Sequence, residues 1–231
     1  MNVRHANVRI LAAALLSAAA LLPMATAAAV ANRSETLGPN IAVNGGFERG
    51  SDPGSYLDIP AGTRYLEGWT SVGSHVQLIG TYWRAKEGTR SLALNTYGNY
   101  PTGSKITPPG TSGVRQTLTT VTGRRYRVTF YQAGSPSDHT LSTVQLAIGG
   151  TSKEYTFRPD TKAGYRAMRW VRRSIVYTAT AASTPLALYV LDTHDWIGLD
   201  NVQVRAICDA TGAASPQPAA TGAPAMVGAR R

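Results

Sequence analysis

Cysteine is almost absent from this sequence, since Cys208 is the only one among 231 residues. A single cysteine can form neither an intramolecular disulfide nor the thiolate clusters that hold zinc. The folded part of the chain must therefore be stabilised by its hydrophobic core, without covalent cross-links. The sequence leaves open whether Cys208 is a free thiol or an intermolecular link.

Apolar runs long enough to cross a membrane are also missing. The apolar run at residues 10–22 is too short to span a bilayer. It follows Arg4 and Arg9 and precedes Ala25-Thr26-Ala27, the small-x-small pattern that signal peptidase reads. We therefore predict a secretory signal peptide at residues 1–27 and a short polar lead at residues 28–39. The mature protein is expected outside the cell, free or associated with the cell wall, with no membrane span.

Acidic residues are scarce. The chain has 13 Asp and Glu residues against 23 Lys and Arg residues, a formal net charge of +10. This balance favours acidic partners, such as acidic wall polymers, whereas nucleic acid is not expected for an exported protein. No acid occurs from Thr161 to Leu191, and a run of basic residues extends from Arg158 to Arg173. A solvated basic face is the alternative interpretation of that run.

Helical periodicity is missing beyond the signal peptide, and strand patterns take its place. Apolar and polar residues alternate in several short segments that glycine or proline turns separate. Residues 114–118 and 126–130 flank Thr122-Gly123 and are predicted to pair as a hairpin. The other expected strands are residues 40–48, 72–79, 91–94, 144–148 with its hairpin partner 153–157, 168–177, the central strand 185–191, and the last strand 197–207.

These patterns are typical of an all-β sandwich or barrel. Residues 40–208 suit one domain with one core. The composition then shifts to Ala, Pro, Gly, Thr and Ser, so residues 209–231 are predicted to be a disordered tail.

Four short motifs carry a family resemblance: Asn44-Gly45-Gly46-Phe47-Glu48, Gly68-Trp69-Thr70, Leu78-Ile79-Gly80-Thr81-Tyr82-Trp83 and Leu199-Asp200-Asn201-Val202. In this order they resemble the choice-of-anchor C family of secreted bacterial proteins, which is related to the plant cell-wall proteins of domain of unknown function 642. Both groups are similar to galactose-binding-like jelly rolls, which include many carbohydrate-binding modules. The resemblance implies a jelly-roll β-sandwich and a cell-envelope context.

The resemblance also implies a metal. In similar modules an acid of the first strand and an acid of the last strand help to bind a structural calcium ion, and Glu48 and Asp200 match those positions here. Calcium takes several hard oxygen ligands, and the first and last strands of a jelly roll can be neighbours. The alternative is that both residues are ordinary acids at strand ends.

The ligand-binding residues are expected around Tyr82 and Trp83. Aromatic rings offer sugars a flat apolar face, and polar neighbours fix the hydroxyl groups. Gln77, Arg90 and Asn95 are the polar partners that we expect. Because tryptophan is usually well buried, the alternative is that Trp83 belongs to the core, as we expect for Trp69 and Trp170.

The motifs of common hydrolases are missing from the sequence. It holds no Gly-x-Ser-x-Gly elbow and no zinc-type histidine pair, although two carboxylates that meet only in space would leave no such motif. We therefore predict a secreted, monomeric, non-catalytic module that binds cell-wall or extracellular polysaccharide, acidic polymers included, and has no catalytic residues. The alternatives are an envelope structural or protein-interaction module without glycan affinity, and a polysaccharide hydrolase.

Overall fold

The protein was analysed as a computed structural model that describes residues 35–73, 75–94, 112–192 and 195–208. The expected signal peptide, the expected tail and Asn95 lie outside these residues. Within the described part of the chain, no helix is long and apolar enough to cross a membrane. The strands are β1 (Thr36–Asn40), β2 (Tyr56–Pro60), β3 (Thr70–Val72), β4 (His75–Ile79), β5 (Ser91–Leu94), β6 (Gly113–Thr119), β7 (Arg125–Gly134), β8 (Ser142–Ile148), β9 (Thr151–Phe157), β10 (Val171–Thr178), β11 (Ser183–Asp192) and β12 (Ile197–Cys208).

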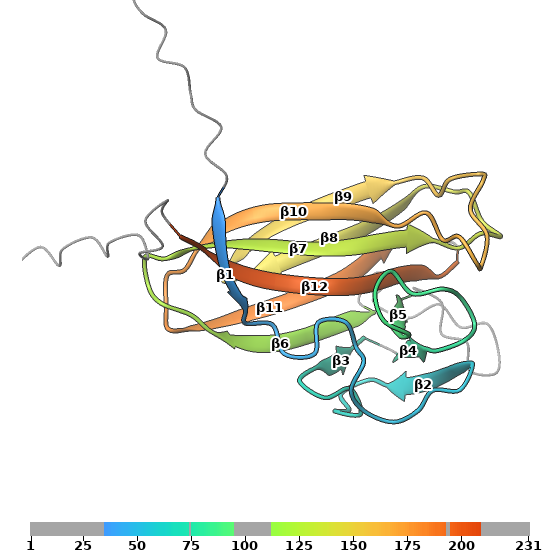
Figure 1. Ribbon diagram of the computed structural model, residues 1–231, viewed down its shortest axis with the longest axis horizontal. Coiled ribbons are helices and arrows are strands. Elements are labelled where there is room, and N and C mark those ends of the chain that lie inside the picture. Colours follow the sequence, from blue (N-terminus) through green and yellow to red (C-terminus); the bar gives the residue numbers. More distant parts are fainter. Residues whose placement is uncertain (1–34, 74, 95–111, 193–194, 209–231) are drawn as a thin grey trace, which may run out of the picture. The chain divides into compact units, whose positions relative to one another are not determined.

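The strands form two antiparallel sheets that pack face to face as a jelly-roll β-sandwich (Figure 1). The seven-stranded sheet has the order β10-β7-β12-β5-β4-β2, and β1 pairs with β12 beside this path. The five-stranded sheet has the order β3-β6-β11-β8-β9. The predicted all-β sandwich is confirmed, and the first and last strands are neighbours, as expected.

One of the two predicted hairpins is correct. β8 pairs with β9 through Gly149 and Gly150, whose φ angles of 53° and 84° suit the tight turn of a two-residue hairpin. The predicted pairing of β6 with β7 is wrong, because β6 belongs to the five-stranded sheet and β7 to the seven-stranded sheet. Alternation along a strand marks which side chains are buried, but it does not identify the partner strand.

The predicted strand at residues 40–48 is also wrong. The first strand, β1, begins earlier, at Thr36 inside the expected polar lead, and already ends at Asn40. The chain then turns at Asn44, which has a φ of 50° and whose Nδ2 donates to the carbonyls of Arg49 and Glu67. Asparagine tolerates this left-handed conformation better than most residues, so the turn is encoded locally.

The main core lies between the two sheets and is built from the inward-facing residues of both. Phe47 and Trp69 belong to it, with their ring centroids 5.6 Å apart. The core position expected for Trp69 is therefore confirmed. With few exceptions the inward side chains along β7, β8, β11 and β12 are apolar, so burial of apolar surface, and not covalent cross-linking, holds the two sheets together.

A second, smaller apolar cluster lies on the outer face of the seven-stranded sheet. Ile79, Ala93 and Ala133 alternate with core residues along β4, β5 and β7, so their side chains point away from the main core. Trp83 and Met168 cover them, and Trp170 and Trp196 pack against the cluster. Two connections therefore close over one end of this sheet.

Candidate functional site

The two covering connections are residues 80–90 and residues 158–170, and hydrogen bonds join them. The Arg84 amide donates to the Tyr165 carbonyl at 2.8 Å, and the Trp170 indole donates to the Arg84 carbonyl at 3.2 Å. Gly198 leaves room for the Trp170 ring, because a Cβ on Gly198 would lie 2.7 Å from it. The connections thus form one packed layer, and their outer surface is fixed from beneath.

Trp83 belongs to this layer and not to an exposed surface. Only 3% of its surface is accessible, and its indole N–H donates to the Ser91 hydroxyl at 2.8 Å. The expectation that Trp83 offers its ring to a ligand is therefore wrong, and the alternative, a core position, is correct. A large apolar ring at the edge of a sheet gains more from burial than from exposure to water.

Tyr82 lies above Trp83 and is exposed, as expected for a ligand-binding residue. It is the centre of three exposed tyrosines that come from three segments: Tyr56 on β2, Tyr82 in the first connection and Tyr165 in the second, with 49%, 46% and 39% of their surfaces accessible. The Tyr82 ring centroid is 6.0 Å from that of Tyr56 and 5.3 Å from that of Tyr165, both edge to face. We call these three residues the tyrosine platform.

Polar groups line one side of the platform. The Tyr165 hydroxyl is 3.5 Å from the Ser137 hydroxyl, which donates to Asp195 Oδ2 at 3.0 Å. Hydrogen bonding with Tyr165 raises the pKa of Tyr82, and burial and the negative charge of Asp195 raise it further. The Tyr82 hydroxyl therefore keeps its proton at neutral pH and can donate to a ligand oxygen.

The other expected ligand-binding residues have structural partners. Arg90 Nη1 donates to the carbonyls of Gly50 and Ser51, so its side chain holds the preceding loop. Gln77 donates to Asp58 at 2.8 Å on the same face of the sheet as Tyr56, next to the tyrosine platform. Gln77 thus shares a sheet face with Tyr56, whereas Arg90 supports the fold of the preceding loop.

Glu48 and Asp200 hold the first connection in place. Glu48 accepts hydrogen bonds from the Thr89 and Arg90 amides at 3.0 and 2.9 Å and from the Thr89 hydroxyl. Asp200 accepts from the Lys86 and Glu87 amides at 2.8 and 3.1 Å and from the Asn201 amide. The two acids therefore bind the backbone of residues 86–90 much as helix-capping acids bind free amides.

Asp200 is fully buried, with 0% of its surface accessible. Burial raises the pKa of its carboxyl to about 7, the neighbouring negative charge of Glu48 also raises it, and the hydrogen bonds from three amides lower it. The connection therefore packs on a carboxyl group whose charge is poorly compensated at neutral pH.

The calcium ion that the resemblance implies does not fit these residues as they lie. All four carboxylate oxygens of Glu48 and Asp200 already accept hydrogen bonds, whereas calcium takes six to eight oxygen ligands. In the described part of the chain, no group of three or more His, Cys, Asp or Glu side chains could hold a metal ion. The calcium site stays a prediction.

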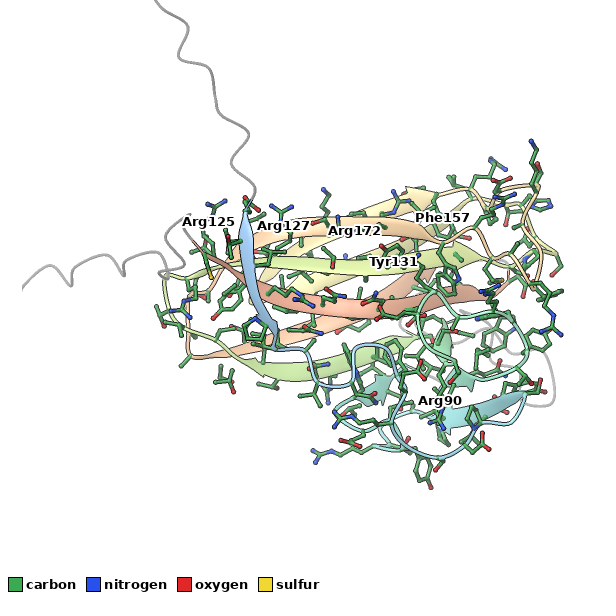
Figure 2. The ribbon with its side chains drawn as sticks, viewed as in Figure 1. Arg90, Arg125, Arg127, Tyr131, Phe157 and Arg172 are labelled. Atoms are coloured by element: carbon green, nitrogen blue, oxygen red, sulfur yellow. The ribbon has the colours of Figure 1, made fainter. Side chains whose placement is uncertain are left out.

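The last two arginines of the basic run lie on β10 and point to opposite faces of the seven-stranded sheet. Arg172 lies opposite Tyr131 on the outer face (Figure 2), whereas Arg173 points to the other face, with its guanidinium 5.7 Å from the Tyr155 ring centroid. The opposite orientation that strand geometry predicts for these two residues is confirmed.

Sequence analysis missed Tyr56 and Tyr165. Each is an isolated tyrosine beside a small residue, in Ser55-Tyr56 and Gly164-Tyr165, and nothing in the sequence links either one to Tyr82. Tyr82 itself was identified from its place after a predicted strand. The missing information is spatial, because the three tyrosines meet only through the layer of connections.

The protein is thus an all-β jelly roll of two sheets, with exposed tyrosine rings above a packed layer of loops. The family model described as "Protein of unknown function (DUF642)" matches residues 40–204, so the chain belongs to that family. The predicted relation to this family is confirmed. The resemblance to the choice-of-anchor C family stays a prediction.

One similar protein is Halomucin of Haloquadratum walsbyi (strain DSM 16790 / HBSQ001), 27% identical over 176 residues. The match covers 63% of this chain but 2% of Halomucin, so it says nothing of what the whole of that protein does.

Three solved structures are similar to this chain. An arabinose-bound GH51 α-L-arabinofuranosidase, MgGH51, is 11% identical with a TM-score of 0.50, over 77% of this chain and 28% of that one. TmCBM61 in complex with β-1,4-galactotriose is 15% identical with a TM-score of 0.43, over 72% and 97%. The CBM22-1 xylan-binding domain of Paenibacillus barcinonensis Xyn10C is 18% identical with a TM-score of 0.43, over 67% and 95%. At such identities the likeness to MgGH51 concerns the fold alone.

Proposed function

We propose that this protein is an extracellular, non-catalytic module that binds polysaccharide through the tyrosine platform. The single observation that carries the proposal is the exposure of Tyr56, Tyr82 and Tyr165 at one place, over a layer that holds them from beneath. Large aromatic side chains gain free energy from burial, so three rings that remain in water next to each other indicate a binding surface.

The geometry suits a sugar chain. Sugar rings have apolar faces of C–H groups that pack on aromatic rings, and hydroxyl rims that need hydrogen-bond partners. The platform offers the rings, and the hydroxyls of Tyr82, Tyr165 and Ser137 lie beside them with the carboxylate of Asp195. The neutral sugar residues of wall or extracellular polymers are therefore the ligand class that we propose.

The edge-to-face contacts also limit how the ligand binds. Because the Tyr82 ring is tilted by 80° to the Tyr56 ring and by 67° to the Tyr165 ring, the three rings do not form one flat surface. A flat crystalline polymer face would touch few of them, whereas a single, flexible chain can bend over each ring in turn. We therefore expect soluble or amorphous polysaccharides to bind better than crystalline ones.

Pull-down on insoluble and amorphous wall polysaccharides tests the proposal, with Tyr82→Ala and Tyr165→Ala as variants. Loss of one stacking ring should cost about 1–2 kcal/mol, so each variant should bind roughly tenfold more weakly. Tyr65→Ala is the matched control, because Tyr65 is 62% exposed and lies outside the platform. It should bind as the parent protein does.

Two outcomes would contradict the proposal. If Tyr65→Ala loses as much affinity as Tyr82→Ala, the binding is a general surface effect. If the parent binds no polysaccharide, the same exposed rings favour the alternative of a protein-interaction module, since aromatic residues are also enriched in protein interfaces.

A further inference from the structure

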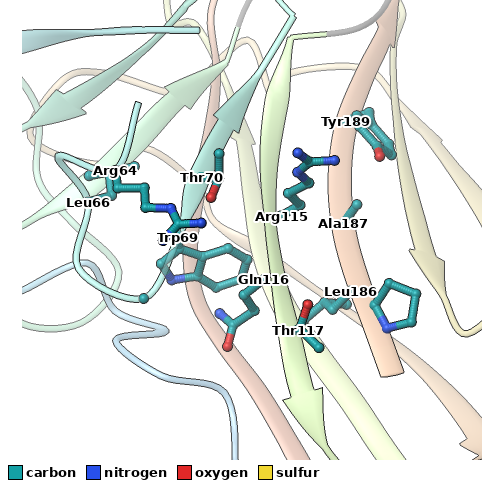
Figure 3. Close-up of a pocket in the computed structure, with 12 residues that line it drawn as sticks. Arg64, Leu66, Trp69, Thr70, Arg115, Gln116, Thr117, Leu186, Ala187 and Tyr189 are labelled. Carbon is teal, nitrogen blue, oxygen red and sulfur yellow. The ribbon is translucent and has the colours of Figure 1, made fainter. Parts of the chain in front are cut away.

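A groove of about 580 Å³ lies on the outer face of the five-stranded sheet, on the other sheet from the tyrosine platform. Thr70, Arg115 and Ala187 are direct cross-strand neighbours on β3, β6 and β11, so their side chains share one row across the sheet. Arg115 stands between Thr70 on one side and Ala187 and Tyr189 on the other (Figure 3). The small side chain of Ala187 leaves the hollow that Arg115 and Tyr189 flank.

The groove is positively charged. Arg64 and Arg115 line it and are both exposed, and none of the described residues that line it is acidic. In the described part of the chain, neither guanidinium forms a hydrogen bond or an ion pair with another residue. Two uncompensated cations a short way apart repel each other, and an anion between them would remove that repulsion.

Three other arginines of the protein have partners within the chain. Arg127 pairs with Glu35, Arg49 pairs with Glu67 at 2.8 Å, and the guanidinium of Arg205 donates to Gln203 and to the Gly38 carbonyl. These side chains take part in the fold, whereas Arg64 and Arg115 have no such role. Both side chains are therefore available to a ligand in the groove.

We propose that this groove binds a carboxylate-bearing sugar residue of an acidic polysaccharide. A guanidinium matches a carboxylate with two parallel hydrogen bonds, which a neutral hydroxyl cannot accept in the same way. Tyr189 lines the groove two residues along β11 from Ala187, on the same face, and offers its ring to the sugar. Thr70 and Thr117 add hydroxyls for the remaining hydrogen bonds.

The volume agrees with this class of ligand. Ligand sites commonly measure about 300–1,000 Å³, so the groove has room for one or two sugar units of a longer chain. Because the groove is an open hollow on a sheet face, the chain can continue at both ends. The site is separate from the tyrosine platform, so it does not require the proposed platform function to be correct.

Binding to polygalacturonate, followed by affinity electrophoresis and calorimetry, tests the groove. The variant is the double change Arg64→Gln and Arg115→Gln. The matched control is Arg125→Gln with Arg172→Gln, which removes the same charge from exposed positions on the outer face of the seven-stranded sheet (Figure 2). Melting curves of both variants establish whether they are folded. If the double variant does not fold, Arg115→Lys, which keeps the charge but loses the planar guanidinium, tests the groove instead.

We expect the groove variant to bind polygalacturonate at least about tenfold more weakly, and the control to change by less than about twofold. Arg115→Lys should lose part of the affinity. The methyl-esterified polymer, which has the same backbone without the charge, should lose the groove contribution. Tyr82→Ala should leave polygalacturonate binding intact.

Three results would overturn the inference. Equal losses in the groove variant and the control would mean that the net charge, and not the groove, attracts the polymer. Equal binding of the acidic and methyl-esterified polymers would mean that carboxylates are not recognised. Failure of the parent to bind polygalacturonate, while a neutral polysaccharide still binds through Tyr82, would refute the groove and leave the tyrosine platform in place.

Discussion

The outer faces of the two sheets differ in how they present side chains. At one end of the seven-stranded sheet, residues 80–90 and 158–170 cover the strands, and a separate apolar cluster forms beneath them. On the five-stranded sheet, the side chains of β3, β6 and β11 line the groove directly. The covered face displays Tyr82 and Tyr165 on loops beside Tyr56 on β2, and the bare face displays Arg115 on β6 beside Arg64 from the loop before β3.

This difference has a physical consequence for how each surface is stabilised. A strand fixes the spacing of its side chains through the hydrogen-bonded ladder, so Arg115 needs no further support. A loop has no ladder, and Tyr82 depends on Trp83 beneath it and on the Glu48 and Asp200 hydrogen bonds to residues 86–90. The platform should therefore be sensitive to changes that leave the groove unaffected.

The largest expected effect comes from Trp83→Ala. Removal of a buried tryptophan leaves a cavity and should lower the free energy of unfolding by about 3–5 kcal/mol, as measured by urea unfolding. Below its melting temperature, the variant should lose neutral polysaccharide binding and keep polygalacturonate binding. Trp83→Phe fills most of the space and loses the hydrogen bond to Ser91, so it should cost less. An unchanged unfolding midpoint for Trp83→Ala would refute the supporting role.

The second-largest effect is a dependence of the free energy of unfolding on pH, which Asp200 should cause. Its folded-state pKa of about 7 lies above the ordinary value of 3.8, so the folded state binds the proton more tightly than the unfolded state does. The free energy of unfolding should therefore fall as pH rises from about 4 to about 7 and be level above that. From pH 5 to pH 8 the contribution of this one group should be about 2–3 kcal/mol.

Comparison with Asp200→Asn isolates this contribution. The variant lacks the titrating group, so the stability difference between parent and variant should be larger at pH 5 than at pH 8, in favour of the parent. A difference that does not vary with pH would show that Asp200 stays ionised in the folded state, as a bound cation would cause.

The smallest expected effect is that of chelation. All four carboxylate oxygens of Glu48 and Asp200 are bonded to residues of the chain, so EDTA at pH 7.5 should change the melting temperature by less than about 1 °C. For a domain of this size, a stability change of 1 kcal/mol would shift the melting temperature by roughly 2–4 °C. A drop of several degrees that added calcium reverses would establish the calcium site that the family resemblance implies, because an ion that binds only the folded state stabilises it. The double change Glu48→Gln and Asp200→Asn should then abolish the drop.

The strands and the class of fold could be predicted because their signal is local. Alternation in β8 and β12 and the apolar run in β11 follow from which face each residue buries. The same signal failed at residues 40–48, where Asn44 turns the chain, and between β6 and β7, where a short turn joins two sheets.

The candidate site was predicted only in part, for a related reason. The pattern around Tyr82 and Trp83 indicated an aromatic surface. The local sequence does not show, however, which of two adjacent aromatic residues is buried and which is exposed. Ile79, Ala93 and Met168 decide the matter, because they form the apolar surface on which Trp83 packs. Glu48 and Asp200 were identified as a pair, and the amides of residues 86–90 that they bind were not.

By itself, the sequence determined that the chain forms an all-β sandwich without disulfides, since strand periodicity and a lone cysteine are properties of the chain read along its length. Only the tertiary structure decided that Tyr56, Tyr82 and Tyr165 meet and that Arg64 and Arg115 share a groove. The physical reason is that a site depends on distances between residues far apart in the chain, and those distances are set by the packing of whole sheets and loops.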